Sequence, residues 1–132
     1  EARSREMPSP AVIEARDIDP VCIRRAEANA RRAGVADMIR FSVGDITASD
    51  LSAFRGVIVT NPPYGERLGN AEAAHMLYRG MSRALGTLDG KRVCVITPDQ
   101  EFEKFFGHRA NRKRWLYNGM IKCSLYLYFP AK

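Results

Sequence analysis

The chain of 132 residues lacks a long apolar run, and none of its apolar stretches approaches the ~20 residues that a membrane-crossing helix needs. It has only three cysteines, Cys22, Cys94 and Cys123, which stand far apart and form no CxxC pair of the kind that zinc or redox sites use. We therefore expect neither a membrane protein nor a metal site. A reducing cytoplasm fits unpaired cysteines, and the composition, 45% hydrophobic and 27% charged, is that of a soluble domain with one core.

Acidic residues are absent from the last part of the chain. Residues 104–132 hold seven Lys and Arg and no Asp or Glu, whereas residues 1–103 hold 14 basic and 15 acidic residues. The net charge of +6 therefore belongs to the C-terminal end. A cluster of charge is usually a solvated face, but it is also what a nucleic-acid-binding surface requires, and charge alone leaves both interpretations open.

Apolar runs alternate with helical patterns along the chain. Strands are predicted at 11–16, 38–43, 56–60 and 91–97, and helices at 20–33, 70–88 and 99–107. Asp19 is the predicted N-cap of the first helix and Gly34 follows its end, while Asp99 is the predicted cap of the last helix. Asn118-Gly119 stands between two β-rich runs and predicts a hairpin.

This order predicts an α/β fold of the Rossmann-like kind. The repeated βαβ pattern indicates an open, mostly parallel sheet with helices on both faces, and the hairpin adds antiparallel strands at the C-terminal end. Within a single domain, residues 1–10 are interpreted as a linker or loop remnant, 11–107 as the βα repeats and 108–132 as the hairpin.

Polar residues follow three of the predicted strands, where an open α/β sheet binds its ligands. Asp17 and Asp19 follow the first strand, Asp45 the second and Asn61 the third. An acid at such a position more often caps a helix or forms a turn, and we assign Asp19 mainly to capping. Asp17 is suited to accept hydrogen bonds from two ribose hydroxyls, and Asp45 to accept one from an exocyclic amine.

The stretch "NPPY", residues 61–64, follows the buried strand "GVIVT" directly. Its prolines fix φ and have no N–H, so the turn is stiff and its carbonyl oxygens are left as acceptors. Asn61 adds a side-chain carbonyl, and the Tyr64 ring can lie over a planar group. Two acceptors and a stacking face suit a flat base that carries an amino group; the alternative is a proline turn that only covers the edge of the sheet.

The stretches "DIDP", "GDI", "NPPYGERLG" and "NRKRWLYNGMIKC" together resemble the class I S-adenosylmethionine-dependent methyltransferases that modify exocyclic amines. More narrowly, the chain is similar to the RNA guanine-N2 methyltransferases that carry a THUMP domain. "NPPY" is also found in DNA adenine methyltransferases and in the glutamine methyltransferases of release factors, whereas "GERLG" and the late "NG" hairpin favour the RNA group.

The resemblance implies methyl transfer from S-adenosylmethionine to the amino group of a guanine in RNA, with ribosomal RNA as the expected partner. It implies that the cofactor is held by residues after the first two strands, namely Asp17, Ile18, Asp45 and Ile46. The target amine would lie against Asn61 and the carbonyl of Pro62, with Tyr64 stacked on the base. A DNA adenine-N6 methyltransferase and a non-catalytic RNA-binding remnant of the fold remain as alternatives.

The resemblance implies a role for the basic C-terminal end, because cations near the site would bind the phosphates of the RNA. The candidate substrate contacts are Pro63, Arg67, Arg109, Arg112 and Arg114. Since side chains alternate along a strand, Arg112 and Arg114 are expected to share a face without Lys113. For Trp115 we expect packing in the core rather than stacking on a base.

The sequence departs from the family in one respect. Class I methyltransferases hold the methionine end of the cofactor in a glycine-rich loop after their first strand, but the first glycine of this chain is Gly34. No THUMP domain precedes the matching residues either. We therefore expect a partial catalytic domain that lacks the first strand and, taken alone, binds cofactor poorly and is inactive; the sequence does not indicate an oligomeric state.

Overall fold

The structure, a computed structural model, describes residues 12–63 and 70–130, with Asn118 described by its backbone only. The chain divides into two compact units, Glu1–Asp45 and Ile46–Lys132. Each unit is described by itself.

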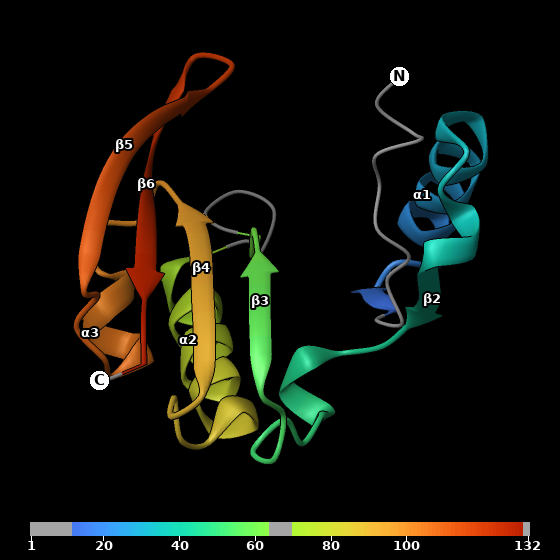
Figure 1. Cartoon of the computed structure of the whole chain (residues 1–132). Coiled ribbons are helices and arrows are strands. Elements are labelled where there is room, and N and C mark those ends of the chain that lie inside the picture. The colour runs from blue at the N-terminus through green and yellow to red at the C-terminus, as the bar shows by residue number, and fades with distance from the viewer. Residues whose placement is uncertain (1–11, 64–69, 131–132) are drawn as a thin grey trace. The chain divides into compact units, whose positions relative to one another are not determined.

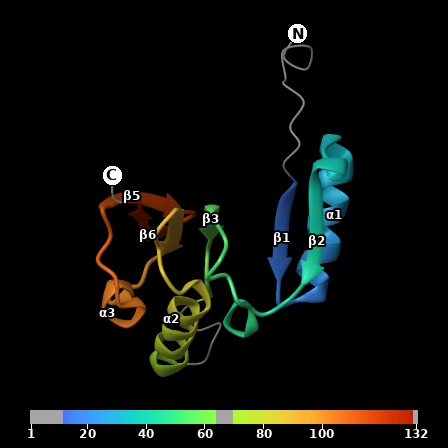
Figure 2. The same ribbon diagram turned by 60° about the horizontal axis from the view of Figure 1, so that its bottom comes forward.

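In the first unit, two parallel strands are joined by a helix. β1 (Ile13–Asp17) pairs with β2 (Ile39–Val43) in a register that sets Asp17 beside Val43, and α1 (Pro20–Ala33) and the short helix η2 (Ala36–Met38) connect them. Asp19 accepts a hydrogen bond from the N–H of Val21 at 2.9 Å, and Gly34 takes the left-handed conformation with φ 76°. Both predicted ends of this helix are confirmed. Figure 2 shows α1 along the two strands.

In the second unit, four strands form a mixed sheet in the order β3-β4-β6-β5 (Figure 1). β3 and β4 are parallel, and β6 runs antiparallel to both β4 and β5. The prediction of an α/β fold with parallel strands and a C-terminal antiparallel hairpin is confirmed. The elements are η3 (Ile46–Ala48), β3 (Gly56–Thr60), α2 (Ala71–Leu85), β4 (Lys91–Thr97), α3 (Phe102–Phe106), β5 (Arg112–Asn118) and β6 (Ile121–Tyr128).

The core of the second unit lies on one face of this sheet, under α2 and α3 (Figure 2). Alternate side chains of β4 and β6 point into it, where they meet apolar residues of the two helices. On the opposite face Val57 and Val59 are 64% and 66% exposed. Helices were predicted on both faces, but among the described residues of this unit they cover one face only.

The short helix α3 is held at both ends by tyrosines of β6. The Tyr126 hydroxyl donates to the carbonyl oxygen of Asp99 at 3.0 Å, and the Tyr128 hydroxyl donates to that of His108 at 2.8 Å. The prediction of Asp99 as the helix cap was wrong, because α3 begins at Phe102 and the Asp99 carboxylate accepts from the N–H of Glu101 in the preceding turn at 2.9 Å.

The hairpin turn lies one residue later than predicted. Asn118 is still paired with Ile121, so the two residues between the strands are Gly119, with φ 66°, and Met120. A glycine meets the need of a tight hairpin for positive φ, which is why "NG" marked the turn but not its register.

Candidate active site

The first unit brings the carboxyl ends of β1 and β2 together. The carbonyl oxygen of Asp17 accepts a hydrogen bond from the N–H of Gly44 at 3.0 Å, so Asp45 follows one residue after this contact. The side chains of Asp17 and Ile18 are exposed, and Asp45 is half-buried. Three of the four predicted cofactor residues therefore lie at one edge of one unit.

The turn after β1 fixes the Asp17 carboxylate. Its Oδ1 accepts from the N–H of Asp19 at 2.9 Å, whereas Asp19 itself is used by the α1 cap. Among the hydrogen bonds of the described residues, none engages Oδ2 of Asp17. An exposed carboxylate with an oriented, available oxygen is suited to accept from the hydroxyls of a ribose.

The fourth predicted cofactor residue, Ile46, belongs to the second unit and begins η3. Its side chain is partly buried against the core. The adjoining Thr47 lies so close to α2 that a Cβ placed on Gly80 would come within 2.6 Å of the Thr47 Cγ2. The absence of a side chain at Gly80 thus lets η3 pack tightly against α2, which fixes the backbone at Ile46.

The predicted catalytic stretch leaves the carboxyl end of β3. Thr60 is paired with Val95 of the parallel strand β4, and Asn61 follows at once. The side chains of Asn61 and Pro63 are exposed and Pro62 is buried. A buried proline anchors the turn while the asparagine beside it stays accessible. The predicted residues Tyr64 and Arg67 lie outside the described residues.

The sequence analysis missed the carboxyl end of β4, which adjoins this stretch. Thr97 is fully buried there; its hydroxyl lies 3.5 Å from that of Tyr78 and accepts from the N–H of Asp99 at 3.2 Å. Burial raises the pKa of Tyr78 to about 12, so this phenol is protonated at neutral pH and is no general base. The rule that ligands bind beyond strand ends would have found Thr97 if applied to the fourth strand.

Two of the cysteines are poor candidates for a nucleophile. Burial raises the pKa of the Cys94 thiol, and burial together with the carboxylates of Asp17 and Asp19 raises that of Cys22. Since the thiolate is the reactive form, both shifts lower the reactivity of these thiols at neutral pH. The described residues include no group of three or more His, Cys, Asp or Glu that could hold a metal ion. Among the helices of 12–63 and 70–130, none is long and apolar enough to cross a membrane.

The basic residues of β5 divide between the two faces of the strand. Lys113 forms an ion pair with Glu103, and its Nζ lies 5.7 Å from the centre of the Tyr126 ring on the helix-covered face. Arg112 and Arg114, the residues on either side of it, are exposed, and the alternation of side chains assigns them to the other face. The contacts of Lys113 place it on the helix-covered face, and the shared face of Arg112 and Arg114 stays a prediction.

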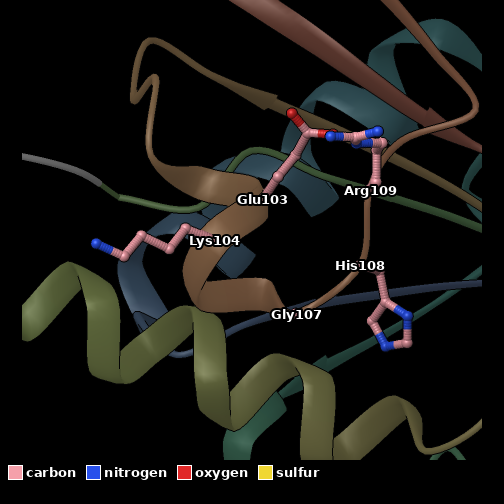
Figure 3. A pocket seen from close by; sticks show the side chains of 5 residues that line it. All are labelled: Glu103, Lys104, Gly107, His108 and Arg109. Atoms are coloured by element: carbon pink, nitrogen blue, oxygen red, sulfur yellow. The ribbon is translucent and has the colours of Figure 1, made fainter.

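Arg109 does not join Arg112 and Arg114. It lines a pocket with Glu103, Lys104, Gly107 and His108, and Figure 3 shows its side chain directed toward Glu103 while that of Lys104 points away. The carbonyl oxygen of the preceding His108 accepts a hydrogen bond from the Tyr128 hydroxyl, and Tyr128 pairs with Val93 near the start of β4. Arg109 therefore lies toward the amino end of β4, away from the edge that carries Asn61.

The prediction for Trp115 was wrong. Its side chain is 61% exposed, and the Nζ of Lys122 lies 3.9 Å from the centre of its ring. Lys122 is a second residue that the sequence analysis missed, because the contact depends on the hairpin register, in which Tyr117 pairs with Lys122 and Trp115 with Ser124.

Comparison with known proteins gives three kinds of match. The family model described as "RMKL-like, methyltransferase domain" matches residues 1–126. Over 120 residues the chain is 40% identical to "Putative RNA methyltransferase YpsC" of Bacillus subtilis, which covers 91% of this chain and 31% of that protein. It is 37% identical over 111 residues to "Ribosomal RNA large subunit methyltransferase K/L" of Legionella pneumophila, covering 83% of this chain and 16% of that protein.

Among solved structures, the chain is similar to SMU.472, described as a putative methyltransferase complexed with SAH. The TM-score is 0.83 at 33% identity, over 91% of this chain and 32% of that one. The chain therefore spans less than a third of the length of these relatives, and its likeness to them concerns one part of each.

Proposed function

The chain belongs to the family of RMKL-like methyltransferase domains, and we propose that it carries the target-amine half of the active site of an enzyme that methylates the exocyclic amino group of a guanine in RNA, with ribosomal RNA as the substrate. The observation that carries the proposal is the exposed Asn61 beside the buried Pro62, directly after the β3 strand. The names of the two relatives support RNA, and in one case ribosomal RNA, as the substrate class.

In this proposal Asn61 and Pro62 orient the reacting nitrogen. The amino group of guanine is a poor nucleophile because its lone pair is delocalised into the ring. Two acceptors, the Asn61 side-chain oxygen and the Pro62 carbonyl, accept hydrogen bonds from its two N–H groups. These hydrogen bonds favour a pyramidal nitrogen and stabilise the positive charge that grows on it during methyl transfer. The buried Pro62 ring keeps both acceptors in place, and Tyr64 would stack on the base.

Direct transfer fits the protonated state of two thiols among the described residues. A covalent intermediate on the protein needs an activated nucleophile, and the thiols of Cys22 and Cys94 are protonated at neutral pH. A strong general base is unnecessary, because a methylated amine gives up its proton readily, and the Tyr78 phenol is too weak an acid to supply a phenolate. If the guanine is paired in the RNA, flipping it out costs a few kcal/mol, which stacking on Tyr64 partly offsets.

The cofactor proposed is S-adenosylmethionine, in keeping with the SAH bound in SMU.472. When bound, it supplies an electrophilic methyl group. Asp17 and Ile18 would hold its ribose and adenine, and Asp45 and the N–H of Ile46 its adenine edge; the exposed Asp17 carboxylate fits this role. The residues before β1 contain no glycine, so no residues are assigned to the methionine end of the cofactor.

Replacing Asn61 with Ala in the full-length protein tests the proposal. Loss of one preorganised group at the reacting atom lowers the rate by about 10²- to 10³-fold, while the dissociation constant for the cofactor changes by no more than a few fold. Asn29→Ala, an exposed amide on α1, is the matched control and leaves the rate unchanged.

The substrate is identified by incubating the full-length protein with labelled cofactor and either ribosomal RNA or DNA, followed by nucleoside analysis. N2-methylguanosine from RNA supports the proposal. N6-methyladenine from DNA would replace it by the DNA-methyltransferase alternative, and RNA binding without transfer to either polymer would indicate a non-catalytic module.

A further inference from the structure

We propose that Trp115, Tyr117 and Lys122 form a platform on the β5–β6 hairpin that stacks unpaired bases of the RNA strand beside the target nucleotide. The inference rests on the proposed function for its choice of RNA. It concerns a surface that the proposed chemistry at Asn61 does not use.

The platform consists of side chains from one face of two adjacent strands. Trp115 and Tyr117 are two residues apart on β5, so their rings stand on the same face, about 7 Å apart along the strand. They are 61% and 67% exposed. Lys122 pairs with Tyr117 across the hairpin, and its Nζ lies 3.9 Å from the centre of the Trp115 ring.

Such an arrangement is unusual for a solvated surface. Two large aromatic side chains that are more than half exposed lose the hydrophobic stabilisation that burial would give, and the turn beside them adds Met120, which is 98% exposed. The Lys122 ammonium occupies one face of the Trp115 ring, so a stacked base would take the other face. Aromatic faces beside a lysine are what proteins use to bind single-stranded nucleic acid, since every base can stack and every phosphate is anionic.

The sheet register places this platform at the same edge as the Asn61 stretch. Trp115 pairs with Ser124, and Ser124 pairs with Thr97, the last residue of β4. Thr60 pairs with Val95, so Pro62 follows at about the level of Thr97. Figure 1 shows the hairpin continuing beyond the arrowheads of β3 and β4. All of these residues belong to the second compact unit.

The distance between the two places suits a short stretch of RNA. Three strand spacings separate β3 from β5, which is about 14 Å. A stacked strand advances about 3.4 Å per nucleotide, so about four nucleotides or fewer would cover that distance. A base flipped into the Asn61 site therefore leaves its neighbours within reach of Trp115 and Tyr117.

Charge and the exposed rings together favour RNA over an acidic or neutral protein surface as the occupant. Residues 104–132 contain seven basic residues and no acidic one, and Arg112 and Arg114 stand exposed on the other face of β5. The hairpin thus presents cations on both of its faces, and the two rings stand on the face that carries Lys122. A polyanion with planar bases complements both features at once.

Binding of a short, fluorescein-labelled single-stranded RNA of mixed sequence to the full-length protein tests the platform. Trp115→Ala is expected to raise the dissociation constant about 5- to 150-fold, the range for loss of one stacked base. Trp115→Phe restores most of the affinity because it keeps a ring. Lys122→Gln lowers the slope of log affinity against log salt by about 0.7, the value for one phosphate contact on a single strand.

Phe129→Ala is the matched control. Phe129 is also exposed and also lies under a cation, with the guanidinium carbon of Arg92 5.6 Å from its ring centre, but it follows the far end of β6. We expect it to leave RNA affinity unchanged. Equal affinities for wild type, Trp115→Ala and Phe129→Ala would overturn the platform, as would an equal loss in both variants.

Hydroxyl-radical oxidation of Trp115 and Tyr117, read by mass spectrometry, decides what covers the platform. Oxidation in the free protein and protection by the RNA support the inference. Protection already present without RNA would show that another protein segment or a second copy lies there, and would overturn it.

The same preparations are assayed for methyl transfer to ribosomal RNA. If wild type transfers no methyl group but the Trp115 variants still lose RNA affinity, the proposed function fails and the platform stands. If wild type methylates ribosomal RNA and the Trp115 variants keep their RNA affinity, the proposed function stands and the platform fails.

Discussion

Gly80→Ala probes the packing that fixes the backbone at Ile46. In an isolated helix this change stabilises, because alanine exceeds glycine in helix propensity by about 1 kcal/mol. In α2 the added Cβ would lie 2.6 Å from Cγ2 and 3.0 Å from Cβ of Thr47. Carbon atoms in contact normally stand about 3.5–4.0 Å apart, so α2 and η3 must separate by about 1 Å.

Forcing an extra methyl group into a packed contact costs about 1–3 kcal/mol. Subtracting the propensity gain of about 1 kcal/mol leaves a net loss of about 1 kcal/mol in the free energy of unfolding. The displacement also moves Ile46, the residue whose N–H is proposed to meet the adenine ring. We therefore expect weaker cofactor binding together with the lower stability.

Urea unfolding of the full-length protein and calorimetric titration with S-adenosylhomocysteine measure the two effects. The double variant Gly80→Ala/Thr47→Ser removes the methyl group at 2.6 Å and should recover most of both losses. A Gly80→Ala variant that is more stable than wild type by about 1 kcal/mol, as in an isolated helix, would refute the reasoning.

Two further predictions concern buried charge. The ammonium group of Lys91 is fully buried and donates to the carbonyl oxygens of Thr87 at 2.6 Å and Ser52 at 3.1 Å. Lys91→Met removes it and should lower the free energy of unfolding in urea by about 2–4 kcal/mol at neutral pH. The control Lys104→Met changes an exposed lysine and should cost little. Burial, with a smaller effect of Arg55, lowers the pKa of Lys91, so wild type should gain stability as the pH rises from that lowered value toward about 10.4, and the Met variant should lack this gain. Burial alone would raise the pKa of Glu103, but hydrogen bonds from Lys113 and the Ala110 N–H outweigh it and lower the pKa. Glu103→Gln should therefore lower the free energy of unfolding by about 1 kcal/mol above pH ~5. The difference in stability between wild type and variant should vanish as the pH falls through the lowered pKa. Glu101→Gln, at the residue that precedes the same helix, is the control, and a pH-independent loss for Glu103→Gln would contradict the assignment.

The parts of the fold that the sequence predicted well are those set by local chemistry. β3 and β4 have the predicted bounds because each is an apolar run between turn residues. α1 begins after Asp19 and ends before Gly34, because a capping carboxylate and a left-handed glycine act within one turn of the helix. Asp45 and Asn61 follow their strands as predicted, whereas β1 begins at Ile13 and includes Asp17 as its last residue, so its predicted range of 11–16 was shifted.

The placements that the sequence did not predict come from contacts between segments far apart in sequence. Trp115 has a large apolar side chain of the kind that cores contain. The hairpin register places it opposite Ser124, beyond the apolar core, where it is exposed. Arg109 is near Arg112 in sequence, yet the bond between Tyr128 and His108 fixes it near the start of β4. No local pattern encodes a strand register, so neither outcome was accessible from the sequence.

The hydrogen bonds of the two β6 tyrosine hydroxyls constrain the length of the segment between their acceptors, Asp99 and His108. Tyr126 and Tyr128 are two residues apart, a span of about 7 Å along the strand, and the chain must leave Asp99 and return at His108 within that span. Insertion or deletion of a single residue within 100–107 would carry one acceptor out of reach, whereas a length change at Gly119 and Met120 would disturb neither. Variation in length among related sequences should therefore accumulate at the tip of the hairpin and be rare in α3.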